Sequence, residues 1–222
     1  MNAFQSRSYL HDKVAIPYVQ ELLAKYDLEG IPYGVEVHDK NLQRALMLFG
    51  RQDEMALKNR YKPDLCIVPR PDGMKINPKV RPFLCEVKSE NETHPNFAIE
   101  FDSFCAAELW DNGQRNVIYI FVKMAQGVPI EARACWVSGL CFKPVFVPRR
   151  FDFEKNIKEL EAKYPRIKFQ PVEHTGGSGT PYFLIRQDAS YLRLFDSFIA
   201  QFLELPSNEI IQQPAIAQLA LF

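Results

Sequence analysis

Two carboxylates and a lysine stand in stretches of this sequence that are otherwise apolar. Asp64 opens the run Leu-Cys-Ile-Val, and Glu86 and Lys88 lie in the run Phe-Leu-Cys-Glu-Val-Lys. Both runs have the length of short strands, in which side chains alternate between the two faces, so Glu86 and Lys88 are expected on the same face. Ionised groups in apolar strands cost free energy unless they are paired or bind a metal ion. These residues are therefore the first candidates for chemistry.

The spacing of the two acids predicts that they meet at one end of a β-hairpin. Asp64 and Glu86 are 22 positions apart, so a symmetric antiparallel pairing would turn near residue 75. Several prolines and the Asp72-Gly73 pair around that point are turn signals. Two carboxylates at one end, with the main-chain carbonyl of Val87, would form a hard-oxygen site suited to Mg²⁺ or Mn²⁺.

Lys88 would place a positive charge beside such a site. An ammonium group there can orient a water molecule and stabilise the charge that develops on an attacked phosphodiester. No group of His and Cys residues has the spacing of a zinc site. The three residues together indicate metal-dependent hydrolysis of a phosphodiester.

Hydrophobic periodicity places these residues within one α/β domain that has additions after residue 123. Pro17 is expected to kink the first helix or to mark a later start. Helices are predicted at about 10–28, 41–58, 96–111, 152–163 and 189–205, and strands at 32–38, 64–68, 83–88, 117–122, 135–140, 145–147 and 182–185.

Pro63-Asp64 on one predicted strand and Glu86-Val87-Lys88 on the next resemble the motif of the PD-(D/E)XK nuclease superfamily. That superfamily includes many type II restriction enzymes, archaeal Holliday-junction resolvases and phage recombination nucleases. The resemblance implies a restriction-endonuclease-like core of helix, three-strand meander, helix and strand over residues 1–125, and the predicted helix at 41–58 departs from that order. Residues 126–222 would be C-terminal α/β additions packed on this core, serving specificity or dimerisation.

The resemblance also implies an activity, a cofactor and a partner. The protein would be a Mg²⁺-dependent deoxyribonuclease, an endonuclease of restriction type or one that processes junctions or flaps. Asp64, Glu86 and the Val87 carbonyl would hold Mg²⁺, with Mn²⁺ able to substitute, and Lys88 would assist the attacking water. DNA is the implied partner, and a homodimer is expected by analogy. Two alternatives stay open: a non-catalytic module that binds nucleic acid or protein, and a nuclease for structured RNA.

Further candidates come from the elements around the hairpin. The N-terminal end of the first helix is expected at the active end, so Asp12, or His11 beside it, is better placed than Glu21 to supply another acid or ligand. Asp12 could instead complement the helix dipole. Weaker candidates are Glu36, His38 and His94.

Positive and polar side chains near the hairpin are candidates for contacts with DNA phosphates. The alternative is an ordinary solvated loop. The candidates for nucleic-acid binding are Arg60, Lys62, Arg81 and Ser89.

Composition limits the remaining possibilities. The chain has 222 residues, 47% hydrophobic and 24% charged, as in soluble globular proteins. Its 27 basic and 27 acidic residues balance, so a nucleic-acid site would be a local basic patch. There is no apolar run of about 20 residues and no apolar signal core, so no membrane partner and a cytoplasmic location are expected. The five cysteines are expected to be reduced thiols, with a Cys66–Cys85 disulfide as an alternative.

Overall fold

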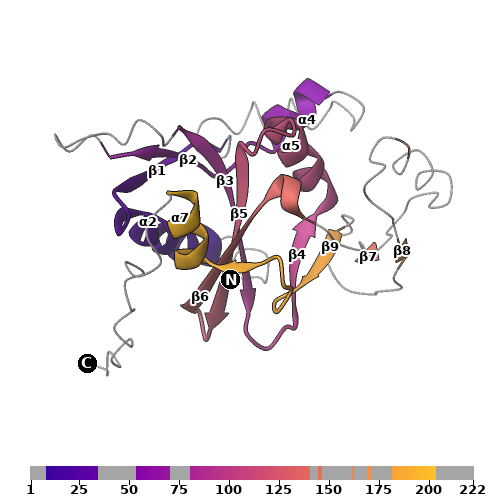
Figure 1. The fold of residues 1–222 in the computed structure, drawn as a ribbon. Coiled ribbons are helices and arrows are strands. Elements are labelled where there is room, and N and C mark those ends of the chain that lie inside the picture. The colour runs from indigo at the N-terminus through magenta and orange to yellow at the C-terminus, as the bar shows by residue number, and fades with distance from the viewer. Residues whose placement is uncertain are drawn as a thin grey trace.

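A computed structural model describes residues 9–34, 54–70, 81–140, 145–146, 162, 170–171 and 182–203. Its centre is a six-stranded mixed sheet with helices on both faces (Figure 1). The strands of this sheet, in spatial order, are β1 (Leu28–Pro32), β2 (Leu65–Pro69), β3 (Phe83–Asn91), β5 (Val117–Ala125), β6 (Val128–Trp136) and β10 (Arg193–Leu194). Strands β3 and β5 are parallel, and the other neighbours are antiparallel. The predicted α/β class is confirmed.

The other elements flank this sheet. Two small sheets pair β4 (Asn96–Glu100) with β9 (Tyr182–Arg186) and β7 (Val145–Phe146) with β8 (Gln170–Pro171). Among the described residues the helices are the π-helical turn η1 (His11–Ala15), α2 (Ile16–Ala24), α4 (Glu54–Arg60), α5 (Phe101–Asp111), the 3-10 turn η3 (Val137–Gly139) and α7 (Phe195–Phe202). Strands β6 and β10 join the main sheet, so segments before and after residue 125 share it. None of the described helices is long and apolar enough to cross a membrane.

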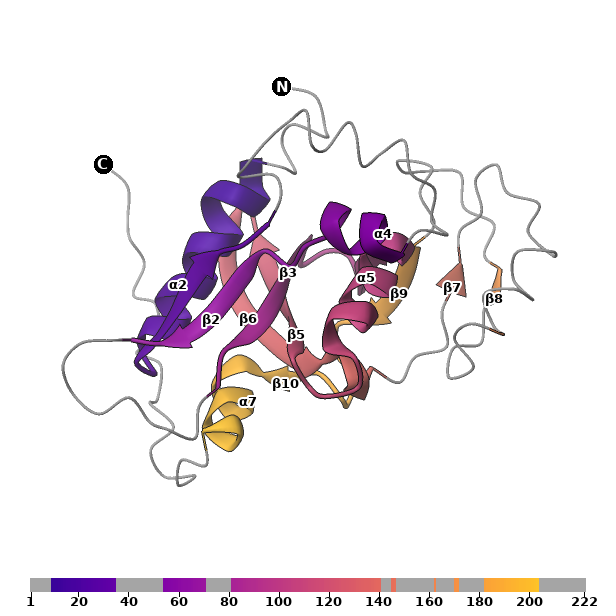
Figure 2. The same ribbon diagram turned by 90° about the horizontal axis from the view of Figure 1, so that it is seen from above.

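One face of the sheet is covered by η1, α2 and α7 (Figure 2). Leu22 and Phe198 from these helices pack with Leu65, Val87 and Ile120 of the sheet in one apolar cluster. Because Val87 and Cys85 point into this cluster, the alternation of a strand turns Glu86 and Lys88 toward the opposite face.

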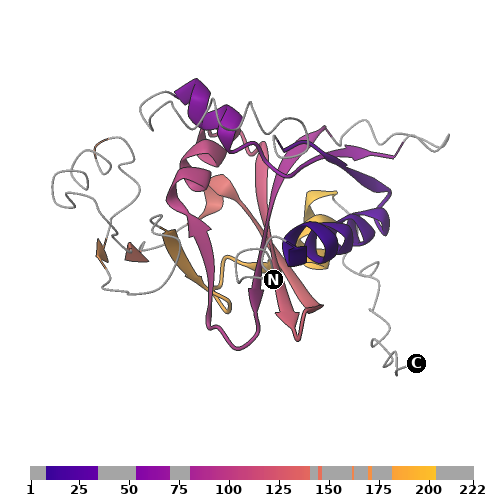
Figure 3. The ribbon, with the colours of Figure 1, turned by 180° about the vertical axis from the view of Figure 1, so that it is seen from behind.

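The opposite face is covered by α5 and by the β4–β9 pair. Phe104 of α5 and Phe97 of β4 pack on Tyr119 and Phe121 of β5 in a second cluster. Figure 3 shows α4 and α5 together on the other side of the molecule from α2. The first six residues of β5 are all buried, as their continuous apolar run predicts for a central strand.

The first helix and strand differ from their predicted bounds. Pro17 lies in the first turn of α2, but the π-helical turn η1 leads directly into that helix, so the proline does not mark a later start of helical structure. The helix ends at Ala24, so its predicted end at 28 was wrong. Strand β1 is Leu28–Pro32, so the strand predicted at 32–38 overlaps it only at Pro32, and residues 35–38 lie outside the described residues. Gly30 lies inside β1, where an added Cβ would lie 3.1 Å from side-chain atoms of Leu23 and Leu65. Close packing between α2 and the sheet explains a glycine there.

The predicted helix at 96–111 is a strand followed by a helix. Phe97 and Ile99 are buried and alternate with less buried neighbours, and they pair with β9 from far along the chain. Helix α5 begins only at Phe101, after the extended residue Glu100. The phenylalanine spacing suggested one long helix because a local pattern carries no information about a distant partner strand.

The remaining predicted elements have mixed outcomes. The helix predicted at 189–205 is shorter, since β10 precedes α7. The strands predicted at 64–68, 83–88, 117–122, 145–147 and 182–185 correspond to β2, β3, β5, β7 and β9. The strand predicted at 135–140 was wrong beyond Trp136, where β6 ends and the 3-10 turn η3 follows. Most of the helices predicted at 41–58 and 152–163 lies outside the described residues; α4 includes the end of the first.

The described cysteines are free thiols. Strand register places Cys66 opposite Leu84 and Cys85 opposite Leu65, so the two cysteines belong to different faces of the sheet. The expected reduced state is confirmed for Cys66, Cys85, Cys105 and Cys135, and Cys141 lies outside the described residues.

Candidate functional site

The β2–β3 pairing brings Asp64 and Glu86 together as their spacing predicts. Leu65 lies opposite Cys85 and Ile67 lies opposite Phe83, so the same register continued by one residue puts Asp64 opposite Glu86. Strand β2 begins at this point, while β3 continues to Asn91 beside β5. The acids therefore lie where the sheet narrows and one strand extends past its neighbour.

Asp64 is held by two different parts of the chain. Its Oδ2 accepts a hydrogen bond of 2.7 Å from the main-chain N–H of Val87. Its Oδ1 lies 3.4 Å from Nε2 of His11, in the π-helical turn that precedes α2. The Asp64 side chain is 16% exposed and that of His11 is 23% exposed. This carboxylate is thus fixed in place and still reachable from solvent.

Glu86 is held by a lysine from its own strand and a serine from α5. Its Oε1 accepts hydrogen bonds of 2.7 Å from Nζ of Lys88 and 2.9 Å from the hydroxyl of Ser103. Lys88 is 22% exposed, Glu86 12% and Ser103 only 3%. Both donors approach the same oxygen, so Oε2 is the Glu86 atom best placed to accept a cation.

The electrostatic environment shifts the pKa values of Glu86, Lys88 and His11. Burial raises the pKa of Glu86, the charge of Lys88 lowers it and that of Asp64 raises it, with a net rise to about 7. Burial lowers the pKa of Lys88, but the negative charges of Glu86 and Asp64 have a larger opposite effect, so the pKa of Lys88 is raised overall. Burial lowers the pKa of His11, but the contact with Asp64 raises it by more, so the net shift is upward. Two acids close together in a partly buried place favour a bound cation.

The residues expected to hold Mg²⁺ are consistent with that ion. Asp64 and Glu86 supply hard oxygen ligands from adjacent strands. The N–H of Val87 points toward Asp64, and in a strand the carbonyl of the same residue faces the same side. Within the described ranges no three or more His, Cys, Asp or Glu side chains form a metal-binding group. Mg²⁺ often keeps several water ligands and needs only one or two carboxylates from the protein.

The N-terminal end of the first helix lies beside Asp64, as predicted, and of the two candidates there, Asp12 and His11, His11 makes the contact. His11 lies against Asp64, whereas its neighbour Asp12 is exposed. Glu21 is exposed on α2, farther along the chain. His94, in the turn after β3, is 59% exposed and lies 2.7 Å from Glu90. Glu36 and His38 lie outside the described residues.

The candidates for phosphate contact are not gathered in one place. Lys62 is two residues before Asp64, close to the acids, and Arg60 ends α4, although its side chain lies outside the described set. Ser89 alternates with Lys88, so it faces the other side of β3. Arg81 lies just before the first residue of β3, at the opposite end of this strand from Asn91. Its guanidinium donates a hydrogen bond to the main-chain carbonyl of Gln114.

Sequence reasoning missed Ser103, the buried hydroxyl that binds Glu86. It lies in the first turn of α5, and no spacing rule links it to Glu86, because strand β4 intervenes between them. The feature of the sequence that could have indicated this serine is its position at the start of the helix that follows the Glu-Val-Lys strand. Tyr119 is also buried beside Glu86, as its neighbour on β5.

Comparisons with protein-family models, with curated proteins and with solved structures find no significant match to this sequence or fold.

Proposed function

We propose that this protein is a metal-dependent deoxyribonuclease with a restriction-endonuclease-like core. The observation that carries the proposal is the meeting of Asp64 and Glu86 on adjacent strands, with Lys88 bound to Glu86 at 2.7 Å. A structural ion pair would need only Glu86 and Lys88. The additional acid, held separately by Val87 and His11, supports a site for a cation and a phosphate.

The order of the elements supports the same proposal. Helix α2, the antiparallel meander β1-β2-β3, helix α5 and strand β5 parallel to β3 follow one another as the resemblance to the PD-(D/E)XK superfamily implies. Helix α4 between β1 and β2 and strand β4 between β3 and α5 are insertions in this order. Asp64 immediately precedes the second strand of the meander and Glu86 lies on the third, as the motif requires.

Each residue has a distinct part in the proposed reaction. Asp64, Glu86 and the Val87 carbonyl would hold Mg²⁺ or Mn²⁺, which when bound supplies Lewis-acid polarisation of the scissile phosphate and of water. Lys88 would donate hydrogen bonds to the phosphate or to the attacking water and offset negative charge as it develops. Ser103 would keep Glu86 in place, and His11 would balance the charge of Asp64.

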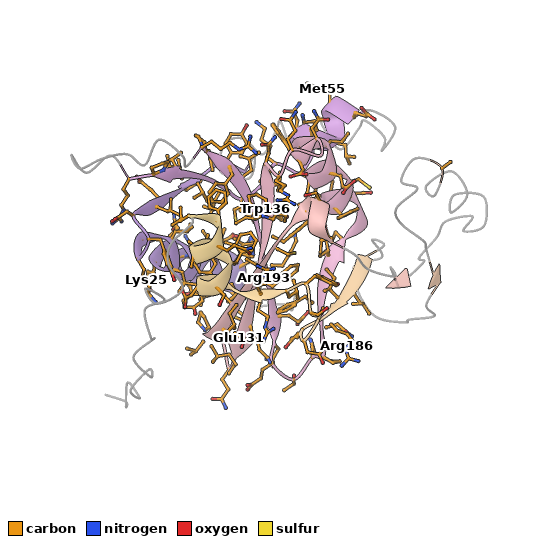
Figure 4. The ribbon with its side chains drawn as sticks, in the orientation of Figure 1. Lys25, Met55, Glu131, Trp136, Arg186 and Arg193 are labelled. Atoms are coloured by element: carbon orange, nitrogen blue, oxygen red, sulfur yellow. The ribbon has the colours of Figure 1, made fainter. Side chains whose placement is uncertain are left out.

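A cleavage assay on plasmid, single-stranded, branched and RNA substrates tests this function. Wild-type protein should cut DNA with Mg²⁺ or Mn²⁺ and stop when EDTA is added. Glu86→Gln, which keeps the size of the side chain, should lower the rate by at least about 100-fold. Lys25→Gln is the matched control, because Lys25 is exposed after α2 and well separated from α4 (Figure 4).

The same panel separates the alternatives. A wild-type protein that binds DNA but cuts nothing with either metal would contradict the nuclease and favour a binding module. Cleavage confined to structured RNA would replace the proposed substrate. A homodimer and a cytoplasmic location stay predictions.

A further inference from the structure

Two aromatic side chains and two lysines gather close to Asp64. The rings of Tyr33 and Trp110 meet edge to face, with centroids 5.9 Å apart and planes at 79°. Nζ of Lys58 lies 4.2 Å from the centroid of the Trp110 ring, and Nζ of Lys62 lies 5.6 Å from that of Tyr33. We call these four residues the aromatic–lysine cluster. Each ring thus has a lysine ammonium over it.

The cluster is fixed relative to the candidate acids. The N–H of Tyr33 donates to the main-chain carbonyl of Asp64 at 2.8 Å, and Lys62 precedes Asp64 by two residues. Trp110, near the end of α5, donates through Nε1 to the Lys58 carbonyl at 3.2 Å and so ties α5 to α4. The contact between these two helices is visible in Figures 1 and 2.

All four side chains are half-buried, so they present surface to solvent while their positions are held. A half-buried aromatic ring offers a flat apolar surface to a ligand, and a lysine over it offers a positive charge. A ligand that uses both must combine planar groups with repeated negative charges. Single-stranded DNA has this chemistry, because its unpaired bases stack on aromatic rings and its phosphates bind cations. Duplex DNA offers the phosphates but keeps the faces of its bases stacked inside the helix.

We propose that the aromatic–lysine cluster is a binding surface for single-stranded DNA that leads the strand to Asp64 and Glu86. The proposal rests on the proposed nuclease function and specifies its substrate as DNA with unpaired bases, such as a free strand or a flap. A base stacks on Trp110 or Tyr33 in place of the lysine ammonium that lies over the ring, and the displaced Lys58 and Lys62 contact the phosphates on either side of that base. The backbone hydrogen bond between Tyr33 and Asp64 sets the distance from the stacked base to the acids.

Tryptophan fluorescence reports this binding without any need for cleavage. The chain has two tryptophans. Trp136 packs on the apolar cluster that α2 and α7 form with the sheet, against Phe198 and Phe202 of α7 (Figure 4). In Trp136→Phe, all tryptophan emission comes from Trp110. In EDTA, an oligothymidylate of about 12 nucleotides should quench this emission. A blunt duplex of the same length should quench it much less.

Variants of the cluster test the contribution of each group. Trp110→Leu should weaken binding of the oligothymidylate by at least about fivefold, the loss expected for one stacked base. The pair Lys58→Gln and Lys62→Gln should reduce the salt dependence of binding by about 0.7 for each lysine on a logarithmic plot. Lys25→Gln should change neither value. A thermal unfolding curve for each variant establishes that it is folded before its binding is compared.

The outcomes separate this inference from the nuclease function. Trp110 emission that does not change while the oligomer binds would overturn the inference, and so would unchanged affinity in folded Trp110→Leu. Quenching and loss of affinity as described, without cleavage in Mg²⁺, would contradict the nuclease and support the DNA-binding surface. Cleavage of duplex DNA at the same rate as single strands would count against the substrate preference and leave the nuclease supported.

Discussion

Ser103 and Glu86 are joined by a hydrogen bond of 2.9 Å, although 17 positions and a complete strand separate them in the sequence. The hydroxyl belongs to α5 and the carboxylate to β3, so the bond fixes the orientation of the acid relative to the helix that covers it. Since Lys88 donates to the same oxygen, the two donors together determine which Glu86 oxygen is left for a cation.

Ser103→Ala should therefore affect metal binding more than substrate binding. Loss of a buried donor to a charged acceptor costs about 1–3 kcal/mol and frees Glu86 to rotate. We expect the Mn²⁺ affinity, measured by calorimetry, to fall about tenfold, a change of about 1.4 kcal/mol. The cleavage rate at saturating metal should fall less.

Ser103→Thr is the matched control, because it keeps the hydroxyl. It should restore most of the metal affinity if the added methyl group is accommodated. Equal metal affinity in Ser103→Ala and the wild type would show that the serine serves packing alone.

Asp64 has two separable parts, a hydrogen-bond acceptor and a negative charge. Asp64→Asn keeps an acceptor for the N–H of Val87, so the free energy of unfolding should change by less than about 1 kcal/mol. It removes the charge, so metal binding and cleavage should be lost. Asp64→Ala leaves the Val87 N–H without this acceptor and should cost about 1–2 kcal/mol more. Urea unfolding combined with the cleavage assay checks both; equal stability of Asn and Ala variants would contradict the structural part.

The spacing of Asp64 and Glu86 was enough to predict their meeting, because an antiparallel register follows from where a turn can form. The continuous apolar run of β5 likewise predicted a buried strand. The pairing of β4 with β9 could not be predicted, because nothing in the local sequence of residues 96–100 indicates that residues 182–186 are their partner. Ser103 could not be predicted for the same reason. The residue of α5 that faces Glu86 depends on where this helix begins, and the helix begins only where β4 ends. His11 rather than Asp12 faces Asp64 because the π-helical turn sets the rotation of that segment.

Lys88→Met should separate the charge of the lysine from its apolar stem. The variant keeps much of the volume of the side chain and removes the ammonium that binds Glu86. We expect cleavage to fall by at least about 100-fold. Because both partners keep some exposure, 22% and 12%, the free energy of unfolding should fall by only about 1–3 kcal/mol, below the cost of breaking a fully buried pair. Cleavage within about threefold of wild type would remove Lys88 from the proposed mechanism.

Tyr26 and Asp196 provide a test of stability far from the candidate site. The hydroxyl of Tyr26, just after α2, donates to Asp196 of α7 at 2.8 Å and ties together the two helices on that face of the sheet. Tyr26→Phe should lower the free energy of unfolding by about 1 kcal/mol and leave cleavage and DNA binding unchanged.

The same pair predicts how stability changes at alkaline pH. Burial, and then the bond and charge of Asp196, raise the pKa of Tyr26 above its ordinary value of 10.0. The folded state therefore holds this proton more tightly than the unfolded state does. Its contribution is complete below about pH 10 and is lost as the pH rises toward the pKa of the folded state. Urea unfolding at several pH values should show a steeper alkaline decline for wild type than for Tyr26→Phe. Parallel declines would mean that another group, such as Tyr18, whose pKa is also raised by burial, dominates the alkaline loss.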